Sequence, residues 1–171
     1  MAIAADGTAR GDVTLSFSGR VVTDPLGIEL DVSVADRAPP PVTQALLADA
    51  RDQLVGGQGN LVFQSVRVAH GALRSYGARL GYDVEPVTES VEVISVDESP
   101  SRLSLRWGWL HEAAPFFHFG TSEHVIEGDP LAFEWPAVGD GVFFFERVEH
   151  PGIPESNYVS AGLEWLRQEI Q

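Results

Sequence analysis

The sequence predicts an α+β domain in which two to three helices pack on a mostly antiparallel β-sheet. Apolar and polar residues alternate along several short segments, as they do in strands with one buried face. Elsewhere apolar residues recur every three or four positions, as they do in amphipathic helices. The chain has 171 residues, of which 44% are apolar, enough for one packed core. We therefore expect a single domain over residues 13–171, after a flexible N-terminus of residues 1–12.

The first predicted element is an N-terminal β-hairpin within residues 13–38. Apolar residues occupy alternate positions over residues 13–21 and again over residues 28–34, and a turn signal at residues 24–27 separates them. A hairpin of this length is only marginally stable alone, so we expect it to pack on the main sheet or along a neighbouring subunit. Two small domains divided at the proline run of residues 39–41 are the alternative.

Two helical patterns follow, at the start of a predicted core of residues 42–170. Val42, Leu46, Ala50 and Leu54 are spaced by four, which predicts a helix that ends at the glycine pair of residues 56–57. Residues 61–80 are ambiguous, because Gly71 and neighbouring valines weaken a helical pattern. There we expect a helix over the second part only.

From Val84 onward the pattern is typical of strands. Val91, Val93, Ile94 and Val96 form one strand-like run, and residues 103–109 alternate so cleanly that they predict the clearest strand of the chain. We expect further strands at residues 125–126, 131–135 and 142–148. A last helix is predicted to open between Pro154 and Asn157. Its inward residues would be Tyr158, Leu163, Leu166 and Ile170.

Charge and composition exclude several classes of protein. Lys and Arg number 11, all arginine, against 25 Asp and Glu, for a net charge of −14. Such a surface repels phosphates, which argues against a nucleic-acid clamp. Scattered carboxylates without lysine favour a high-salt cytoplasm, where a Debye length of about 3 Å screens self-repulsion. An acidic protein at ordinary salt is the alternative.

Neither export nor cysteine chemistry is expected of this chain. It contains no cysteine, so disulfides, thiolate zinc sites and cysteine nucleophiles are excluded. No apolar run approaches the roughly 20 residues that span a bilayer. The N-terminus lacks a basic segment followed by an apolar one, so we expect synthesis in the cytoplasm without a cleaved signal.

No motif indicates catalysis or a bound cofactor. His118 and His124 are six residues apart, unlike the i, i+4 pair of a helical metal site. Ser122 lacks the following glycine that a nucleophile elbow requires, because His124 stands there. Glu146 and Glu149 are interpreted as solvated positions of a strand. We therefore expect no catalytic residue, no metal and no cofactor.

Several short motifs occur in a characteristic order along the chain. The first is Gly71-Ala72-Leu73-Arg74-Ser75, preceded by His70. The second is Ala114-Pro115-Phe116-Phe117-His118-Phe119-Gly120-Thr121, followed by His124. Aromatic strands with Phe133 and Trp135 come next, and Val148-Glu149-His150-Pro151-Gly152 closes the series. In this order, over residues 42–170, the motifs resemble those of the tail-completion (minor tail component) proteins, a head–tail joining family of long-tailed double-stranded DNA phages.

The resemblance implies a non-enzymatic virion protein, made in the host cytoplasm, that forms a ring at the head–tail junction. The ring would be a homo-oligomer, a hexamer, which contacts an adaptor or stopper and the tail tube or tail terminator. Genomic DNA would pass through its lumen without specific binding. With the lysine-free composition, the resemblance implies a tailed virus of halophilic archaea. The residues that it implies as motif or interface positions are Leu73, Arg74, Phe116, Phe117, Phe119, Gly120, Thr121, His124, Phe133, Trp135, His150, Pro151, Gly152 and Tyr158.

Two features depart from the family pattern, and other functions remain open. Residues 157–161 replace the family's Pro-Phe-Leu-Arg-Pro run, and the N-terminal hairpin has no counterpart. A tail terminator or another neck ring, an adaptor or stopper, is an alternative of the same kind. A cellular binding module that uses exposed aromatics and a hydrolase that uses Ser122 or His124 are alternatives of other classes. Whether Trp107, Trp109 and the phenylalanines fill the core or line an interface is open at this point.

Overall fold

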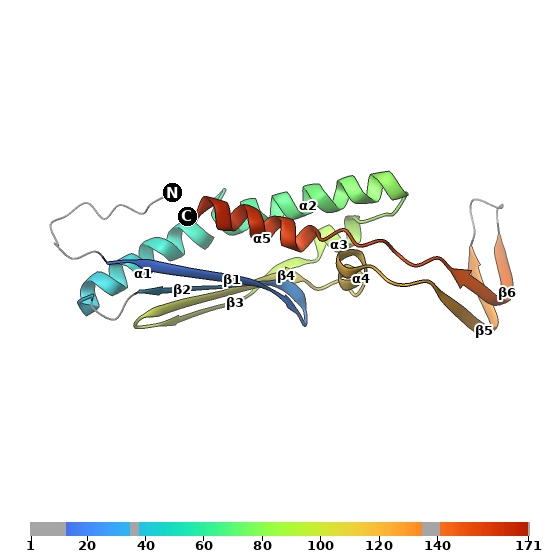
Figure 1. Ribbon diagram of the computed structural model, residues 1–171, viewed down its shortest axis with the longest axis horizontal. Helices are drawn as coiled ribbons and strands as arrows, with labels where there is room; N and C mark the ends of the chain where they lie inside the picture. Colours follow the sequence, from blue (N-terminus) through green and yellow to red (C-terminus); the bar gives the residue numbers. More distant parts are fainter. Residues whose placement is uncertain (1–12, 35–37, 135–140, 171) are drawn as a thin grey trace.

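The main sheet has four antiparallel strands in the order β1-β2-β4-β3 (Figure 1). The strands are β1 (Leu15–Thr23), β2 (Leu26–Val34), β3 (Val91–Ser99) and β4 (Arg102–Trp109). The computed structural model describes residues 13–34, 38–134 and 141–170. The predicted flexible N-terminus, residues 1–12, lies outside the described residues, as does Trp135.

The N-terminal hairpin is built into this sheet. Strand β2 pairs with β4 over most of its length, with Ile28 opposite Trp107 and Leu30 opposite Leu105. These four side chains point to the same face of the sheet and are almost completely buried. The sequence pattern predicted the alternation in both strands. The pairing of β2 with β4 joins residues on either side of the proline run in one sheet.

Three helices cover one face of the sheet (Figure 1). They are α1 (Pro40–Val55), α2 (Leu61–Leu80) and α5 (Tyr158–Glu169). Helices α2 and α5 come close together where Gly162 meets Ser65, whose hydroxyl donates a hydrogen bond to the Gly162 carbonyl over 3.1 Å. A Cβ at Gly162 would lie 2.8 Å from the Ser65 carbonyl oxygen. The fold is therefore α+β, with an N-terminal β-hairpin, as the sequence predicts.

Two predictions for the middle of the chain are wrong. Residues 61–80 form one continuous helix, because the Asn60 side chain caps it by accepting a hydrogen bond from the Phe63 amide over 2.8 Å. Gly81, with a φ of 79°, ends it in the left-handed conformation. The strand pattern expected from Val84 begins only at β3. A short helix, α3 (Glu85–Glu89), precedes that strand, and it has a proline in its first turn, where proline is tolerated.

A second, two-stranded sheet lies apart from the body of the molecule. It consists of β5 (His124–Glu134) and β6 (Val142–His150), which follow the short helix α4 (Ala114–Phe119). We call this hairpin the arm; it lies beyond one end of the main sheet, along the longest axis (Figure 1). The two strands expected at residues 125–126 and 131–135 form one strand, with a register shift between Glu127 and Leu131. Among the described residues, no helix is long and apolar enough to cross a membrane.

Candidate functional site

The root of the arm is built by two glycines that the motifs contain. Gly120 has a φ of 72° and Gly152 a φ of 83°, values that L side chains rarely adopt. A Cβ on Gly120 would lie 2.5 Å from the Ile153 carbonyl oxygen, and one on Gly152 would collide with the Thr121 carbonyl oxygen. Each turn therefore requires glycine for its conformation and for the close approach of the opposite chain.

Backbone hydrogen bonds hold the two chains of the root side by side. The Thr121 amide donates to the Ile153 carbonyl over 2.8 Å, and the Ile153 amide donates back over 3.1 Å. The Thr121 hydroxyl oxygen accepts a further bond from the Ile153 amide over 3.0 Å. Across Pro151, the His150 Nδ1 accepts from the Gly152 amide over 3.1 Å. These contacts fix where the arm leaves the body.

The first cross-strand pair of the arm is formed by two histidines. The rings of His124 and His150 lie opposite each other in the register, with centroids 4.9 Å apart. The His124 Nδ1 lies 3.0 Å from the Ser122 carbonyl oxygen, which orients that ring. No group of three or more His, Cys, Asp or Glu side chains in the described ranges is placed to hold a metal ion. The two imidazoles are neighbours at the point where the arm begins.

Helix α4 divides its aromatic side chains between the core and the surface. Phe117 is buried, with its ring centroid 6.2 Å from that of Tyr76 and 5.7 Å from that of Tyr82. Phe116 and Phe119 are 51% and 50% exposed. Phe117 therefore anchors the helix, while Phe116 and Phe119 are available for an interface.

His118 connects α4 to the start of α5. Its side chain is buried, packs edge-on against the Tyr158 ring at 5.6 Å, and accepts at Nδ1 from the Val159 amide over 3.4 Å. Burial lowers the pKa of His118 below its ordinary value, and the carboxylate of Glu155 opposes this shift. A neutral imidazole suits the site, because a proton on Nδ1 would face another N–H donor at a helix N-terminus.

The large aromatics of β4 and α5 belong to the core. Trp107, Trp109 and Tyr158 are each at most 1% exposed. The Tyr158 ring packs edge-on against Trp109 at 5.1 Å, and the Trp109 indole donates to the His70 Nε2 over 3.0 Å. Burial raises the pKa of Tyr158. Trp107 and Trp109 therefore fill the core of the monomer and do not line an interface.

Leu73 and Arg74 lie on α2, far from the root of the arm in the sequence. Leu73 is buried, whereas Arg74 is exposed and donates two hydrogen bonds of 2.8 Å to the Glu85 carboxylate. The hydrogen bond from Arg74, with a second from Thr88, lowers the pKa of Glu85 from 4.5 to about 2. The pair connects α2 to α3, and the described contacts of Arg74 do not include the arm.

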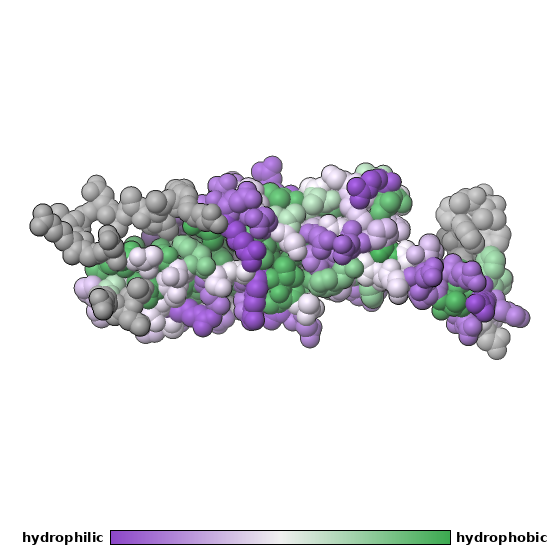
Figure 2. Space-filling view, viewed as in Figure 1, coloured by the Kyte–Doolittle hydropathy of each residue, from purple (hydrophilic) through white to green (hydrophobic). Residues whose placement is uncertain are grey.

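The arm itself exposes apolar side chains. Phe144 is 66% exposed, and Val125, Ile126 and Val142 are also exposed. Figure 2 shows hydrophobic (green) and hydrophilic (purple) residues side by side at this end of the molecule. The side chain of Phe133 lies outside what the structure describes. In the part of the chain that the structure describes, these apolar side chains of the arm are therefore open to solvent.

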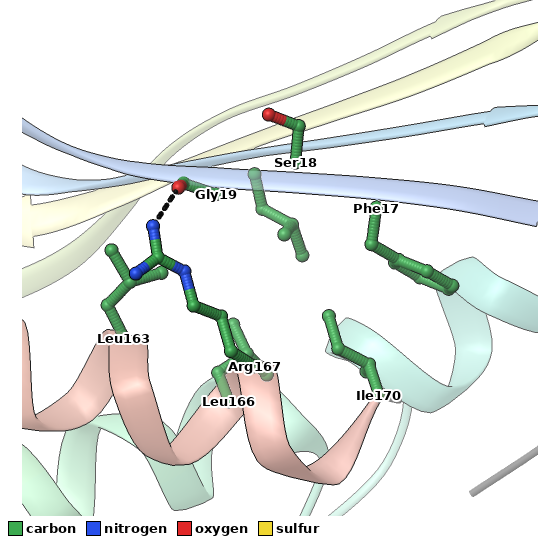
Figure 3. A pocket seen from close by; sticks show the side chains of 8 residues that line it. Phe17, Ser18, Gly19, Leu163, Leu166, Arg167 and Ile170 are labelled. Atoms are coloured by element: carbon green, nitrogen blue, oxygen red, sulfur yellow. Dashed lines mark hydrogen bonds between the residues drawn. The ribbon is translucent and has the colours of Figure 1, made fainter.

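A groove between β1 and α5 was not found by sequence reasoning. It has a volume of about 380 Å³, and its walls include Phe17, Leu163 and Ile170 (Figure 3). The Arg167 guanidinium donates to the Gly19 carbonyl over 2.8 Å and closes one side of it. Its side chains are mostly apolar, apart from Ser18 and Arg167, and the Arg167 guanidinium is already hydrogen-bonded.

The sequence motifs also missed the outward face of α2, where Phe63 and Arg67 are exposed. The helical spacing of these positions is visible in the sequence, but an exposed face is recognised only when the buried face is known. No protein-family model, curated protein sequence or solved structure matches this chain.

Proposed function

We propose that this chain is a non-enzymatic virion structural protein that forms a ring at the head–tail junction and joins or completes the tail on the DNA-filled head. The observation that carries this proposal is the arm. A two-stranded hairpin is at best marginally stable in water. This one exposes Phe144 and three further apolar side chains, so a partner chain is expected to cover it.

Self-association provides that partner without any second protein. When each copy places its arm on the next one, the interface is heterologous, and a ring results if the rotation closes. The motif glycines Gly120 and Gly152 fix the exit of the arm, which makes the angle between neighbouring copies reproducible. A ring of six copies would contact an adaptor or stopper on one side and the tail tube or terminator on the other.

The charge of the chain is compatible with a channel for DNA. A net charge of −14 disfavours tight contacts with phosphates, so a duplex would slide through the lumen without being held. The same composition, without lysine, suits a virus whose host keeps a high-salt cytoplasm.

Absolute copy number in purified virus particles tests this proposal. Isotope-dilution mass spectrometry would count this chain against the portal protein and the main tail protein. We expect a small fixed number, equal to one ring. Absence of the chain from particles would overturn the proposal.

A second candidate is a cellular binding module, favoured by the exposed pair Phe116 and Phe119 on α4. Such a module would be a stable monomer that binds a defined partner through these rings and does not enter particles. Replacement of both residues by serine would abolish that binding and leave a folded monomer, because both rings are exposed.

A further inference from the structure

The outward face of α2 is basic in a strongly acidic protein. Residues Leu61–Leu80 contain three arginines and no carboxylate, whereas the whole chain carries −14. Five exposed positions at helical spacing form what we call the α2 face: Phe63, Arg67, Gly71, Arg74 and Ala78. Arg74 is paired with Glu85, but Arg67 has no ion-pair partner among the described residues. The α2 face thus combines an unpaired cation with an exposed phenylalanine.

Gly71 lies in the middle of this face without a reason inside the chain. A glycine within a helix is destabilising relative to alanine. A Cβ on Gly71 would meet no atom within 4 Å, so no neighbour among the described residues of the same copy requires its absence. Glycine at an exposed helical position permits another backbone to approach closely.

The arm has the opposite charge. Residues 124–150 contain six carboxylates and one arginine. Alternation along β6 places Val142, Phe144, Glu146 and Val148 on one side, and the register adds Ile126 opposite Val148. We call these five residues the arm face. It combines exposed apolar side chains with an exposed carboxylate, the complement of the α2 face.

The arm lies beyond the end of the body in Figure 1, so the natural receptor of its arm face is a second copy. We propose that the arm face of one copy packs on the α2 face of the next, with Glu146 near Arg67 and the arm backbone crossing the helix at Gly71. This inference rests on the proposed ring and names the contact that closes it. When Phe63 and Phe144 cover the ion pair of Glu146 with Arg67, salt screens that pair less than it screens an exposed pair.

The exposed edge of the main sheet is the competing receptor. Val93 on β3 is 54% exposed, and Ile94 and Val96 are exposed beside it. However, the same strand carries Glu92 and Asp97, which repel an acidic arm, and a third carboxylate, Glu98, which is paired with Arg51 over 2.8 Å. Charge therefore favours α2 over β3.

Charge reversal tests the contact in the purified full chain, at a salt concentration where circular dichroism shows the native fold. Light scattering would measure the mass of the oligomer. We expect Arg67→Glu and Glu146→Arg each to reduce the oligomer to monomers, and the combined variant to restore it. The control Arg51→Glu makes the same change on an exposed arginine of α1 and should leave the mass unchanged. An unchanged mass in Arg67→Glu, or no restoration in the combined variant, would overturn the contact.

Engineered cysteines give an independent test, because the chain has none of its own. The double variant Glu146→Cys with Arg67→Cys should form a ladder of covalent multimers on mild oxidation. The matched variant Glu146→Cys with Glu92→Cys, which places the second thiol on β3, should not. A ladder from the β3 variant alone, or a wild-type chain that stays monomeric at millimolar concentration, would overturn the proposal.

The two proposals fail in different ways. Ring-like copy number in particles without an arm-to-α2 ladder would leave the neck function standing and remove this contact. A ladder from a chain that is absent from particles would keep the contact and remove the neck function.

Discussion

The body and the arm of this protein use similar alternating strands in different ways. In the body, β4 lies between two strands and under helices, and Trp107 is 1% exposed. In the arm, β6 pairs with one strand, no second layer covers it among the described residues, and Phe144 is 66% exposed. The same pattern of residues therefore stabilises the monomer in one place and leaves an unsatisfied surface in the other. Alternation of apolar and polar residues thus predicts a strand, but it does not predict which element covers the apolar face of that strand.

The largest expected effect separates the two regions directly. Trp107→Ala should lower the free energy of unfolding by about 3–5 kcal/mol, because it removes a buried indole and leaves a cavity. Phe144→Ala should change it by less than about 0.5 kcal/mol, because the ring is exposed in the monomer. Denaturant unfolding of both variants at one salt concentration measures the difference. Similar losses would show that the arm contributes to the monomer core.

The next effect concerns the junction of the two regions. Gly152→Ala should destabilise the root by about 1–3 kcal/mol, because it adds left-handed strain and a collision with Thr121. Hydrogen exchange should quicken at the amides of Thr121 and Ile153 while β4 stays protected. The matched control is Gly57→Ala, where φ is 66° but nothing lies within 4 Å of the added Cβ. If Gly57→Ala cost as much, the close approach at the root would be unimportant.

A pH effect of intermediate size is expected where α4 meets α5. The pKa of His118 is lowered by burial, so below its ordinary value of 6.5 the unfolded chain binds a proton that the folded chain does not. The contribution of His118 to the free energy of unfolding is therefore fully present above pH 6.5. It decreases as the pH falls below that value, by at most about 1.4 kcal/mol per pH unit. Burial also lowers the pKa of His70, so this residue changes the free energy of unfolding in the same direction. Unfolding of His118→Gln between pH 5 and pH 8 should show a shallower dependence; an equal slope would assign the effect elsewhere.

The smallest effect distinguishes monomer stability from assembly. Gly71→Ala should stabilise the monomer by about 0.5–1 kcal/mol, because it raises helix propensity without any contact. Thermal unfolding of a monomeric background, Glu146→Arg, would detect an increase of a few degrees. Gly71→Trp should keep the helix but block assembly. A loss of stability in Gly71→Ala would place an unrecognised contact at that position within the monomer.

Sequence reasoning predicted the elements with a clear period and missed those that depend on local capping. The alternation of residues 103–109 identified β4, and the spacing in residues 42–54 identified α1. Only part of the helix of residues 61–80 was predicted, because Gly71 lowers its helix propensity. The Asn60 cap and the contact with α5 stabilise the helix despite that lower propensity. Gly120, Thr121 and Gly152 are three of the fourteen positions that the resemblance implied, and these three meet at the root of the arm.

The sequence by itself determined the α+β class, the acidic lysine-free surface and the aromatic, glycine-bounded segment that becomes the arm. These are properties of composition and of short periods, which neighbouring residues alone can express. Only the tertiary structure decided that Trp107 and Trp109 face the core, that β2 lies at the centre of the main sheet, and that the arm stands uncovered. Those facts depend on which distant segments pair, because a side chain is buried only when elements far apart in the chain close over it.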